Sequence, residues 1–442
     1  MATSRPPTQL AIHSEGRIAL VRGEDGELGL PELPGWDGEP WTFRRTRAAQ
    51  EDLGPVARTE VTHLAPLHFG GKGTGAVALA EAREPVTGAD AWWQAGDDLP
   101  AGMPPQAAIG LTVALTRKFA GPDWPVFCLP GATEMLRELV ASDTALADRA
   151  TFSLRDDDPP SELEQVQGWP LSSVWRNSEL VLKLTNPAWA GEAAVTRLLA
   201  RLAPTRVPEV FSAGTVRGDP AATPYLVQRR VIEPPDFEDG PADAHRQRSV
   251  SVLHAMAEVQ RACEGHLEDL IGAGAVDRTP RRTARELAEL WKAIDEQLTD
   301  EERDKVPTLD TLAREVLRRL ERGPAVLVHG DLHLGNVMSD DDGQPQIIDW
   351  TDAALAWPGV DAYIMLARLK PSDEEREELV GAYVSALGEE HEMGVRLGLD
   401  VAPLYHALSY LRIGKFFPRE LLGPFGTEAT RLVRAQMDVF GL

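Results

Sequence analysis

Two short segments of the chain contain the polar side chains whose types and spacing suggest chemistry. The segment HGDLHLGN, from His329 to Asn336, contains Asp331 and ends at Asn336. Asp349 lies thirteen residues beyond that end, directly after two isoleucines in IIDW. An aspartate, an asparagine and a second aspartate on adjoining loops form the minimal set for moving a phosphoryl group from Mg·ATP to a hydroxyl. Asp331 is predicted to orient the acceptor and take its proton. Asn336 and Asp349 are predicted to supply oxygen ligands to Mg²⁺.

Short β-segments are expected to position these side chains. Residues 325–328 are apolar and predict a strand that leads into the loop, and residues 346–348 predict a second strand after the turn at 339–345. A hairpin of this kind brings Asn336 and Asp349 close together. The alternative is that these polar side chains only cap turns, as Asp and Asn often do. The HGD before the loop and the IIDW after it, at hairpin spacing, favour the catalytic interpretation.

The motifs HGDLHLGNVM and IIDWTDAALAWPGVDAYIML, at 329–338 and 347–366, resemble the aminoglycoside phosphotransferase family. That family is related to choline kinases and, more distantly, to protein kinases. The resemblance extends over about 161–442, and it implies a two-lobed, protein-kinase-like α+β fold with a small β-rich lobe and a large helical lobe. It also implies ATP as donor, Asp331 as the catalytic base, and Asn336 and Asp349 as magnesium ligands.

The resemblance assigns supporting roles to three more residues near the motif. Asp361 is implied to cap the helix that follows it and to brace the catalytic loop, and His329 to support that loop from a buried place. His333 lies inside the loop, where it either contacts the acceptor or phosphate or simply fills the turn. The turn-filling role is the favoured one.

A lysine and a glutamate are predicted to hold the phosphates of ATP. Lys183 lies between apolar neighbours in LVLKLT, and Glu192 follows nine residues later at the start of a predicted helix. The resemblance implies that such a lysine contacts the α- and β-phosphates and that the glutamate holds the lysine. The alternative is a strand lysine whose tip reaches solvent.

The rest of the predicted nucleotide site is less well marked. The family's phosphate loop corresponds to 167–176, which has no G-x-G-x-x-G, although Gly168, Ser172 and Ser173 offer N–H groups and hydroxyls to phosphate oxygens. The resemblance implies that adenine lies against the linker between lobes, from Gln228 to Val231.

Composition changes divide the chain into four predicted segments. Residues 1–120 read as mixed α/β, with strands at 10–13 and 17–21 and a short helix at 41–53, and 121–160 as a connector with one helix at 132–147. The predicted small lobe covers 161–235 and the helical lobe 236–442. Within the latter, apolar spacing predicts helices at 243–264, 281–297, 308–322, 372–390, 400–414 and 426–439.

The first 120 residues resemble a degenerate Nudix domain. The resemblance rests on LGLPELPG at 28–35, on Gly38 and Glu39, and on RAAQEDLG at 47–54. Ala48 stands where that family places a metal-binding carboxylate. We therefore expect a non-hydrolytic docking or regulatory domain, which offers a surface for a protein partner or for self-association. Trp92 and Trp93 are expected in its core or interface.

Composition restricts the function classes further. The 442 residues carry a formal net charge of −24, which argues against nucleic acid as a partner and favours cationic small molecules, unless the acidity only maintains solubility. No run of 18 apolar residues and no secretory signal is present, so a cytoplasmic, membrane-free protein is expected. Cys128 and Cys263 are expected to be free thiols.

The acceptor is expected to lie between the catalytic loop and the helices after 370. Asp352, Trp350 and Trp357 are close enough in sequence to line that pocket, and such groups suit an amino sugar, an aminoglycoside or an amino alcohol. Core packing is the favoured alternative for the two tryptophans. The predicted function is a small-molecule kinase. The rivals are an ATP-gated binding protein and, through the N-terminal domain, a hydrolase of nucleoside diphosphate derivatives.

Overall fold

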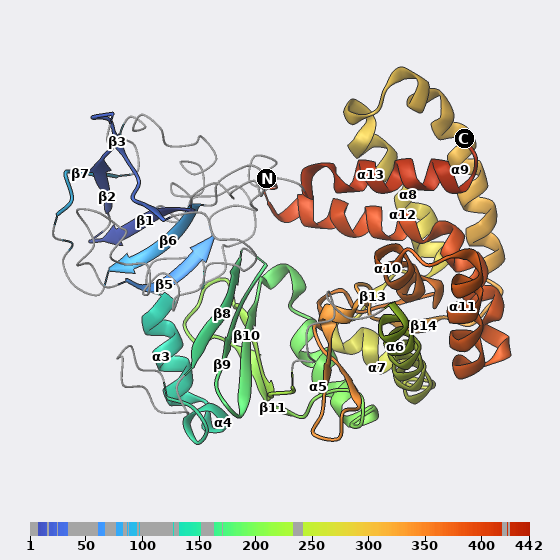
Figure 1. Cartoon of the computed structure of the whole chain (residues 1–442), viewed down its shortest axis with the longest axis horizontal. Coiled ribbons are helices and arrows are strands. Elements are labelled where there is room, and N and C mark those ends of the chain that lie inside the picture. The colour runs from blue at the N-terminus through green and yellow to red at the C-terminus, as the bar shows by residue number, and fades with distance from the viewer. Residues whose placement is uncertain are drawn as a thin grey trace. The chain divides into compact units, whose positions relative to one another are not determined.

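A computed structural model describes most of the chain and divides it into two compact units. The first contains Met1–Ala190, Phe211–Arg230 and Phe416–Gly426, and the second contains Gly191–Val210, Val231–Lys415 and Thr427–Leu442 (Figure 1). The described residues are 8–33 without 16 and 24, 61–66, 77–82, 86, 88–94, 97, 127, 132–151, 163–232 without 170, 242–417, 422 and 425–442.

The N-terminal strands of the first unit form one mixed sheet. The strands are β1 (Thr8–Ser14), β2 (Arg17–Arg22), β3 (Leu28–Gly29), β4 (Glu32–Leu33), β5 (Val61–Pro66), β6 (Val77–Ala82) and β7 (Ala91–Trp93). The path is β3-β2-β1-β6-β5, with β4 on β1 and β7 on β2, and β1 pairs in parallel with β6. The strands predicted at 10–13 and 17–21 are confirmed, and they form an antiparallel hairpin in which Ser14 pairs with Arg17. Trp93 is in the core, as expected.

Most of the residues on which the Nudix resemblance rests lie outside the described part of the chain. The predicted helix at 41–53, Gly38, Glu39 and the segment 47–54 with Ala48, Glu51 and Asp52 all fall there. The Nudix-like character of this region, and any docking role for it, therefore stay predictions. Cys128 also lies outside the described residues, so its free thiol stays a prediction, whereas Cys263 is a buried free thiol.

The connector contains two helices where the sequence predicted one. These are α3 (Ala132–Ser142) and α4 (Thr144–Ala147). The break falls at Asp143, whose extended backbone and side chain cap α4 by accepting from the N–H groups of Ala145 and Leu146. An aspartate that offers its own carboxylate to the next two amides starts a new helix and does not continue the old one.

A five-stranded antiparallel sheet completes the first unit. Its strands are β8 (Glu164–Trp169), β9 (Ser172–Arg176), β10 (Leu180–Thr185), β11 (Val210–Thr215) and β12 (Pro224–Arg229), in the order β11-β12-β10-β9-β8. Leu180, Leu182 and Leu184 of β10 are fully buried and alternate with Val181 and Lys183, which are half-buried. The alternation places Lys183 on the more open face of the sheet.

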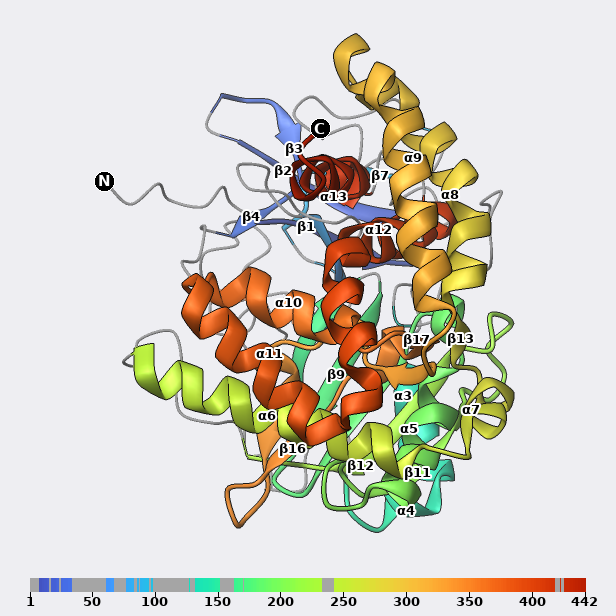
Figure 2. The ribbon, with the colours of Figure 1, turned by 90° about the vertical axis from the view of Figure 1, so that its right-hand side faces the viewer.

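Helices make up most of the second unit (Figure 2). After the 3-10 turn η3 (Pro187–Trp189) in the first unit, they are α5 (Glu192–Leu202), α6 (Ala242–Ala262), α7 (Leu267–Ala273), α8 (Pro280–Ile294), α9 (Asp300–Leu320), α10 (Gly359–Leu369), α11 (Asp373–Leu387), α12 (Glu392–Phe416) and α13 (Phe425–Val439). Helix α8 packs along α9, and α6 packs along α11. None of the described helices combines the length and the apolar character that a membrane span requires.

Several helix boundaries differ from the predicted ones for local reasons. Helix α9 begins at Asp300, eight residues before its predicted start, because Thr299 and Glu302 form a capping box. Pro307 lies inside α9, just before the predicted start at 308, and Pro403 lies inside α12, which begins at Glu392 and not at the predicted 400. Helix α10 was implied by the resemblance but not predicted by apolar spacing, because its buried apolar residues leave little polar face to reveal a period.

Two small sheets position the motif residues. Strands β13 (Val276–Asp277), β17 (Ala354–Ala356) and β14 (Val326–Val328) form the first, in that order, and β15 (Val337–Ser339) and β16 (Pro345–Ile347) form the second. Val328 pairs with Ala354, and Val337 pairs with Ile347. The strand predicted before His329 and the hairpin predicted after Asn336 are both confirmed.

Candidate active site

The catalytic loop is held by the carboxylate of Asp361. Its Oδ2 accepts the N–H of His329 at 3.1 Å and its Oδ1 accepts the N–H of Gly330 at 3.0 Å. Asp361 is fully buried, and burial raises its pKa to about 7, against the effect of the two amides. The bracing role implied by the sequence is therefore confirmed. The capping role is wrong, because α10 starts two residues before Asp361 and shows no side-chain cap.

Gly330 is required by both its backbone angle and its surroundings. Its φ is +85°, and a Cβ there would lie 2.5 Å from the Asp352 carbonyl oxygen and 2.9 Å from the Asp352 Cβ. Any other residue would be strained and would push the loop away from the segment that follows Asp349. The glycine of HGD thus sets how closely the two functional segments approach each other.

His329 supports the loop as a buried neutral imidazole. Its Nδ1 accepts the N–H of Asp331 at 3.3 Å, and its Nε2 lies 2.8 Å from the carbonyl oxygen of Ile348. A carbonyl can only accept, so the proton is on Nε2. Burial lowers the pKa of His329. The imidazole therefore connects the residue before Asp349 to Asp331 and places the two carboxylates on adjoining segments.

Asp331, Asn336 and His333 form one hydrogen-bonded turn. The Nδ2 of Asn336 donates to the backbone oxygen of Asp331 at 2.9 Å, which leaves Oδ1 as the side-chain atom suited to a hard cation. The Nδ1 of His333 accepts the N–H of Gly335 at 3.0 Å, and its Nε2 lies 3.6 Å from an Asp331 carboxylate oxygen. Almost half of the Asp331 side chain is exposed to solvent.

His333 fills the turn, as the favoured alternative predicted. A Cβ on Gly335 would lie 2.8 Å from the His333 ring. The glycine is needed to make room for the imidazole. The turn at 333–336 therefore depends on a ring packed over a glycine.

Asp349 lies at the end of the hairpin in an uncommon backbone conformation. Its φ of 63° and ψ of 62° are left-handed, and its Oδ1 accepts the hydroxyl of Thr351 at 2.5 Å. Strain of this kind gathers at functional sites, and aspartate tolerates it better than most residues. The N–H of Ile348 donates to the Asn336 carbonyl at 3.0 Å. Asn336 therefore lies opposite the residue directly before Asp349, at the end of the hairpin formed by β15 and β16.

The two tryptophans of the motif are core residues and do not line a pocket. Trp350 and Trp357 are 1% and 2% exposed. Their indole N–H groups donate to the carbonyl oxygens of Ile347 and Gly398. The favoured alternative, core packing, is therefore confirmed, and the prediction that the two tryptophans line the acceptor pocket is wrong, because both side chains are buried and hydrogen-bonded to the backbone. Asp352 remains half-buried beside Gly330.

The predicted phosphate-binding pair is divided between the two units. Lys183 is in the middle of β10 in the first unit, with Val174 and Leu226 as its cross-strand neighbours. Glu192 is the first residue of α5, is 3% exposed, and belongs to the second unit. The sequence had placed this helix in the small lobe. The pairing of the two residues remains a prediction.

The other predicted nucleotide-site residues lie in or beside the five-stranded sheet. Ser173 is 1% exposed, and its hydroxyl accepts from Gln165 and Trp175, so this side chain belongs to the sheet interior and not to a phosphate site. Ser172 is the first residue of β9. Gln228 is buried in β12, and Val231 follows that strand.

The loop's deeper support could not be found from sequence. Gln260 of α6 donates to the Leu327 carbonyl of β14 at 2.9 Å, and the Tyr383 hydroxyl of α11 donates to Gln260 at 2.8 Å. Both side chains are buried. Polar residues on long helices normally face water, so nothing in the pattern distinguishes these two from surface residues.

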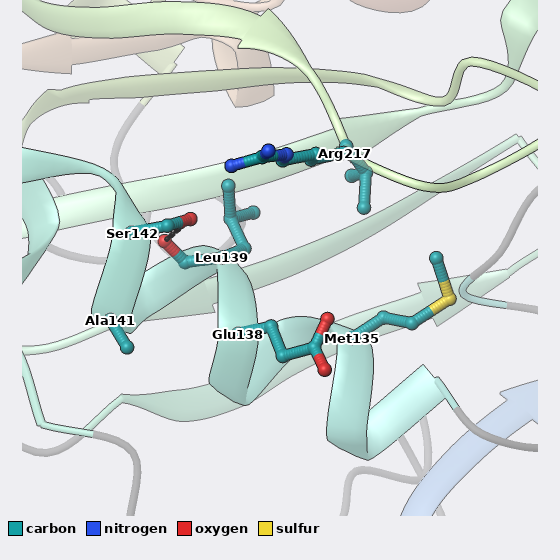
Figure 3. A pocket seen from close by; sticks show the side chains of 7 residues that line it. Met135, Glu138, Leu139, Ala141, Ser142 and Arg217 are labelled. Atoms are coloured by element: carbon teal, nitrogen blue, oxygen red, sulfur yellow. Dashed lines mark hydrogen bonds between the residues drawn. The ribbon is translucent and has the colours of Figure 1, made fainter.

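A pocket of about 380 Å³ lies in the first unit. It is lined mainly by α3 and by the turn that follows β11, where Figure 3 shows Arg217 across from Leu139 and Ser142. No residue of either motif contributes to it. The described residues contain no group of three His, Cys, Asp or Glu side chains suited to a metal, and the predicted magnesium site of one asparagine and one aspartate stays a prediction.

The braced loop, the Asp–Asn turn and the Asp349 hairpin all lie within one segment that matches a known protein family. Comparison with protein-family models identifies residues 164–396, more than half of the chain, as a match to the phosphotransferase enzyme family named APH. The chain belongs to this family. It is a small-molecule kinase with a protein-kinase-like fold, as its motifs predicted.

Solved structures with similarity to the chain have low identity to it. A GDP complex of aminoglycoside 2'-phosphotransferase-IIIa is 18% identical, with coverage of 64% of this chain and 94% of that one and a TM-score of 0.46. A choline/ethanolamine kinase family protein from Mesorhizobium loti is 20% identical, with 70% and 95% coverage and a TM-score of 0.47. A macrolide 2'-phosphotransferase from Brachybacterium faecium is 17% identical, with 67% and 98% coverage and a TM-score of 0.42. A search of curated proteins found no match.

Proposed function

We propose that the protein transfers the γ-phosphoryl group of Mg·ATP to a hydroxyl group of a small molecule. The observation that supports this most directly is the arrangement of the Asp331 turn and the Asp349 hairpin. Asn336 contributes to both, since its side chain donates to the Asp331 carbonyl and its carbonyl accepts from Ile348. The arrangement supplies a carboxylate for the acceptor beside a pair of oxygen ligands.

The donor atoms of the turn and hairpin fit a hard divalent cation. The Asn336 Oδ1 and the Asp349 carboxylate would hold Mg²⁺, which usually takes one or two protein oxygens together with water and phosphate oxygens. When bound, the ion neutralises charge on the phosphate oxygens. The left-handed backbone at Asp349 fixes the direction of its carboxylate before nucleotide arrives.

Asp331 acts on the acceptor. Its carboxylate accepts a hydrogen bond from the acceptor hydroxyl and takes the proton as the oxygen attacks the γ-phosphorus. The bond between that phosphorus and the β–γ bridging oxygen breaks, and its electron pair leaves with ADP. The backbone of Asp331 is fixed by His329, and that of the two preceding residues by Asp361. This fixation supplies orientation, which is a large part of phosphoryl-transfer catalysis.

The remaining predicted residues complete the nucleotide site in this proposal. Lys183 contacts the α- and β-phosphates, Glu192 holds the lysine, and the turn that ends at Ser172 covers the phosphates. The backbone from Gln228 to Val231 binds adenine. Lys183 is half-buried between the buried residues Leu182 and Leu184, so its side chain is directed to the opposite face of the sheet from theirs. This position supports the proposed contact of Lys183 with phosphate.

Replacement of Asp331 by asparagine tests the proposal. Transfer from γ-labelled ATP is measured with a panel of hydroxyl acceptors, and ATP affinity is measured separately by calorimetry. In Asp331→Asn, turnover should fall by about 10²–10⁴ because proton removal is lost, while ATP binding changes little. Asp341→Asn, in the exposed turn of the hairpin, is the matched control. Wild-type turnover in Asp331→Asn would remove Asp331 from this role.

A further inference from the structure

A buried arginine lies beside the catalytic loop without a carboxylate partner. Arg278 is 7% exposed, between β13 and α8. Its Nη1 donates to the hydroxyl of Ser409 at 2.5 Å, and its guanidinium lies 4.4 Å from the centre of the Tyr405 ring. Among the residues that the structure describes, no aspartate or glutamate forms an ion pair with it. Burying a guanidinium among neutral groups is costly unless an anion compensates it.

The cluster around Arg278 adjoins the catalytic segment. The charge of Arg278 lowers the pKa of Asp352. Asp352 in turn lies against Gly330 of the catalytic loop, where an added Cβ would overlap the Asp352 main chain. Burial, together with the charge of Asp331, raises the pKa of Asp352 to about 6. Asp352 is an anion above that pH, but among the described residues it forms no ion pair with Arg278, so the guanidinium has no carboxylate in direct contact.

Helix α12 connects this arginine to the reacting group. Tyr405, Ser409 and Arg412 share one face of the helix at spacings of four and three, and His406 and Tyr410 form the adjacent face. The charge of Asp331 acts on both His406 and Tyr410. Ser409, Tyr410 and Arg412 are partly exposed, so the cluster reaches the surface along this part of α12.

The nearby glutamates have arginines of their own. Glu286 pairs with Arg282 at 3.3 Å, and Glu428 pairs with Arg431 at 2.7 Å. They are therefore not available to compensate Arg278. The guanidinium of Arg412 and that of Arg278 act on each other as like charges.

We propose that the acceptor carries an anionic group, a carboxylate or a phosphate, in addition to the hydroxyl that is phosphorylated, and that Arg278 binds this group. The inference rests on the proposed function and specifies its acceptor. It replaces the cationic acceptor expected from composition. A net charge acts at long range and is screened by salt, whereas a buried guanidinium acts on a group in contact with it.

Binding of four matched probes to the full chain tests the inference. Glucose is neutral and glucosamine cationic, whereas glucuronate and glucose 6-phosphate carry a carboxylate and a phosphate on the same ring. Calorimetry should show at least tenfold tighter binding of one anionic probe than of glucose or glucosamine, and the stronger of the two identifies the anion. Equal binding, absent binding of both anions, or a preference for glucosamine overturns the inference.

Substitutions locate the effect. Arg278→Met should reduce the binding of the preferred anionic probe at least tenfold, and Arg278→Lys, which keeps the charge, should retain part of it. Arg412→Gln, at a partly exposed position, provides a second variant if Arg278→Met fails to fold. The control is Arg396→Gln on the same helix, whose arginine pairs with Glu377 and Glu392. Unchanged binding in all Arg278 variants and in Arg412→Gln contradicts the proposal.

The readouts separate this inference from the proposed function. If the anionic probe binds through Arg278 but no phosphoryl group is transferred to any acceptor, the kinase mechanism fails and the anion site stands. If transfer occurs to neutral or cationic acceptors without any effect of Arg278→Met on the KM for acceptor, the kinase mechanism stands and the anion site fails.

Discussion

At the scale of single residues, the site depends on polar groups whose backbone or protonation state is fixed by burial. Asp361 and His329 are fully buried and hold the loop through amides and one carbonyl. Asp331 and Asp349 are the residues left facing solvent. A rigid buried frame with exposed acids is what positioning chemistry requires, because an exposed acid can meet a substrate while its backbone stays still.

Removal of the Asp349 carboxylate should weaken Mg·ATP binding. Loss of even an outer partner of a metal ligand costs about 10–100-fold in affinity, so Asp349→Ala should cost at least as much in a Mg·ATP titration. Asp349→Asn keeps a residue that tolerates the left-handed backbone and isolates the charge. Asp342→Asn, in the exposed turn, is the control. An unchanged affinity in Asp349→Ala would remove the residue from the metal site.

Buried His406 should make stability depend on pH. Burial lowers its pKa to about 4 from 6.5, so between these values the unfolded chain binds more protons than the native one. Its contribution to stability is present above pH 6.5 and is lost as the pH falls toward 4, by about 2 kcal/mol at pH 5. Asp361, with its pKa raised to about 7, contributes in the opposite direction.

The variant His406→Gln isolates this term. Urea unfolding at pH 7 and pH 5 gives the difference between variant and wild type at each pH, and the variant should gain about 2 kcal/mol relative to wild type on going to pH 5. His254→Gln, at an exposed position of α6, should show no such gain. The same difference at both pH values would mean that His406 does not titrate with folding.

At the scale of elements, the loop is positioned by close approaches between segments that are far apart in sequence. Helices α10 and α12 meet through two glycines: a Cβ on Gly359 would lie 2.6 Å from the Gly398 carbonyl carbon. A Cβ on Gly398 would overlap the Trp357 ring, which is buried and donates to the Gly398 carbonyl. Since α10 carries Asp361, this contact determines where the brace lies.

Alanine at Gly398 should therefore destabilise the second unit, although alanine normally favours helices. We expect a loss of about 1–3 kcal/mol from overpacking in urea unfolding. Gly381 lies in α11 with open space around it, so Gly381→Ala should instead gain about 0.5–1 kcal/mol. Equal effects of the two substitutions would show that the α10–α12 contact can expand without cost.

At the scale of the whole molecule, the connector at 121–160 is hydrogen-bonded to the five-stranded sheet of the first unit. Asp143 accepts hydrogen bonds from Ser212 at 2.5 Å and Tyr225 at 2.7 Å in addition to capping α4. Burial alone would raise the pKa of Asp143, but these hydrogen bonds outweigh it and the pKa is lowered. The Asn177 amide also donates to the Arg149 carbonyl at 2.9 Å. The predicted linker thus packs on the five-stranded sheet (Figure 1).

Loss of the Asp143 carboxylate should loosen this attachment. Asp143→Ala removes the α4 cap and leaves two hydroxyls without their acceptor, so stability should fall by about 1–3 kcal/mol. Thermal unfolding of the full chain is the measurement, and Asp148→Ala, at an exposed position just after α4, is the matched control. A midpoint that does not differ from that of Asp148→Ala would show that the connector does not stabilise the sheet.

The sequence by itself determined the chemistry and its local frame. The order His-Gly-Asp, the Asn five residues after the Asp and the hairpin before Asp349 are short-range patterns, and glycines and polar residues at such spacing allow few backbone arrangements. The alternation of apolar residues that marks β10 is also a short-range pattern. These features predicted the kinase-like class, the strand before His329 and the hairpin after Asn336.

Only the tertiary structure decided what surrounds that frame. Arg278 is more than a hundred residues from Tyr405 and Ser409 along the chain, yet the three side chains form one cluster. Gln260 and Tyr383 look like surface residues of long helices until packing buries them against β14. Contacts of this kind follow from how helices pack, which spacing along one segment does not encode.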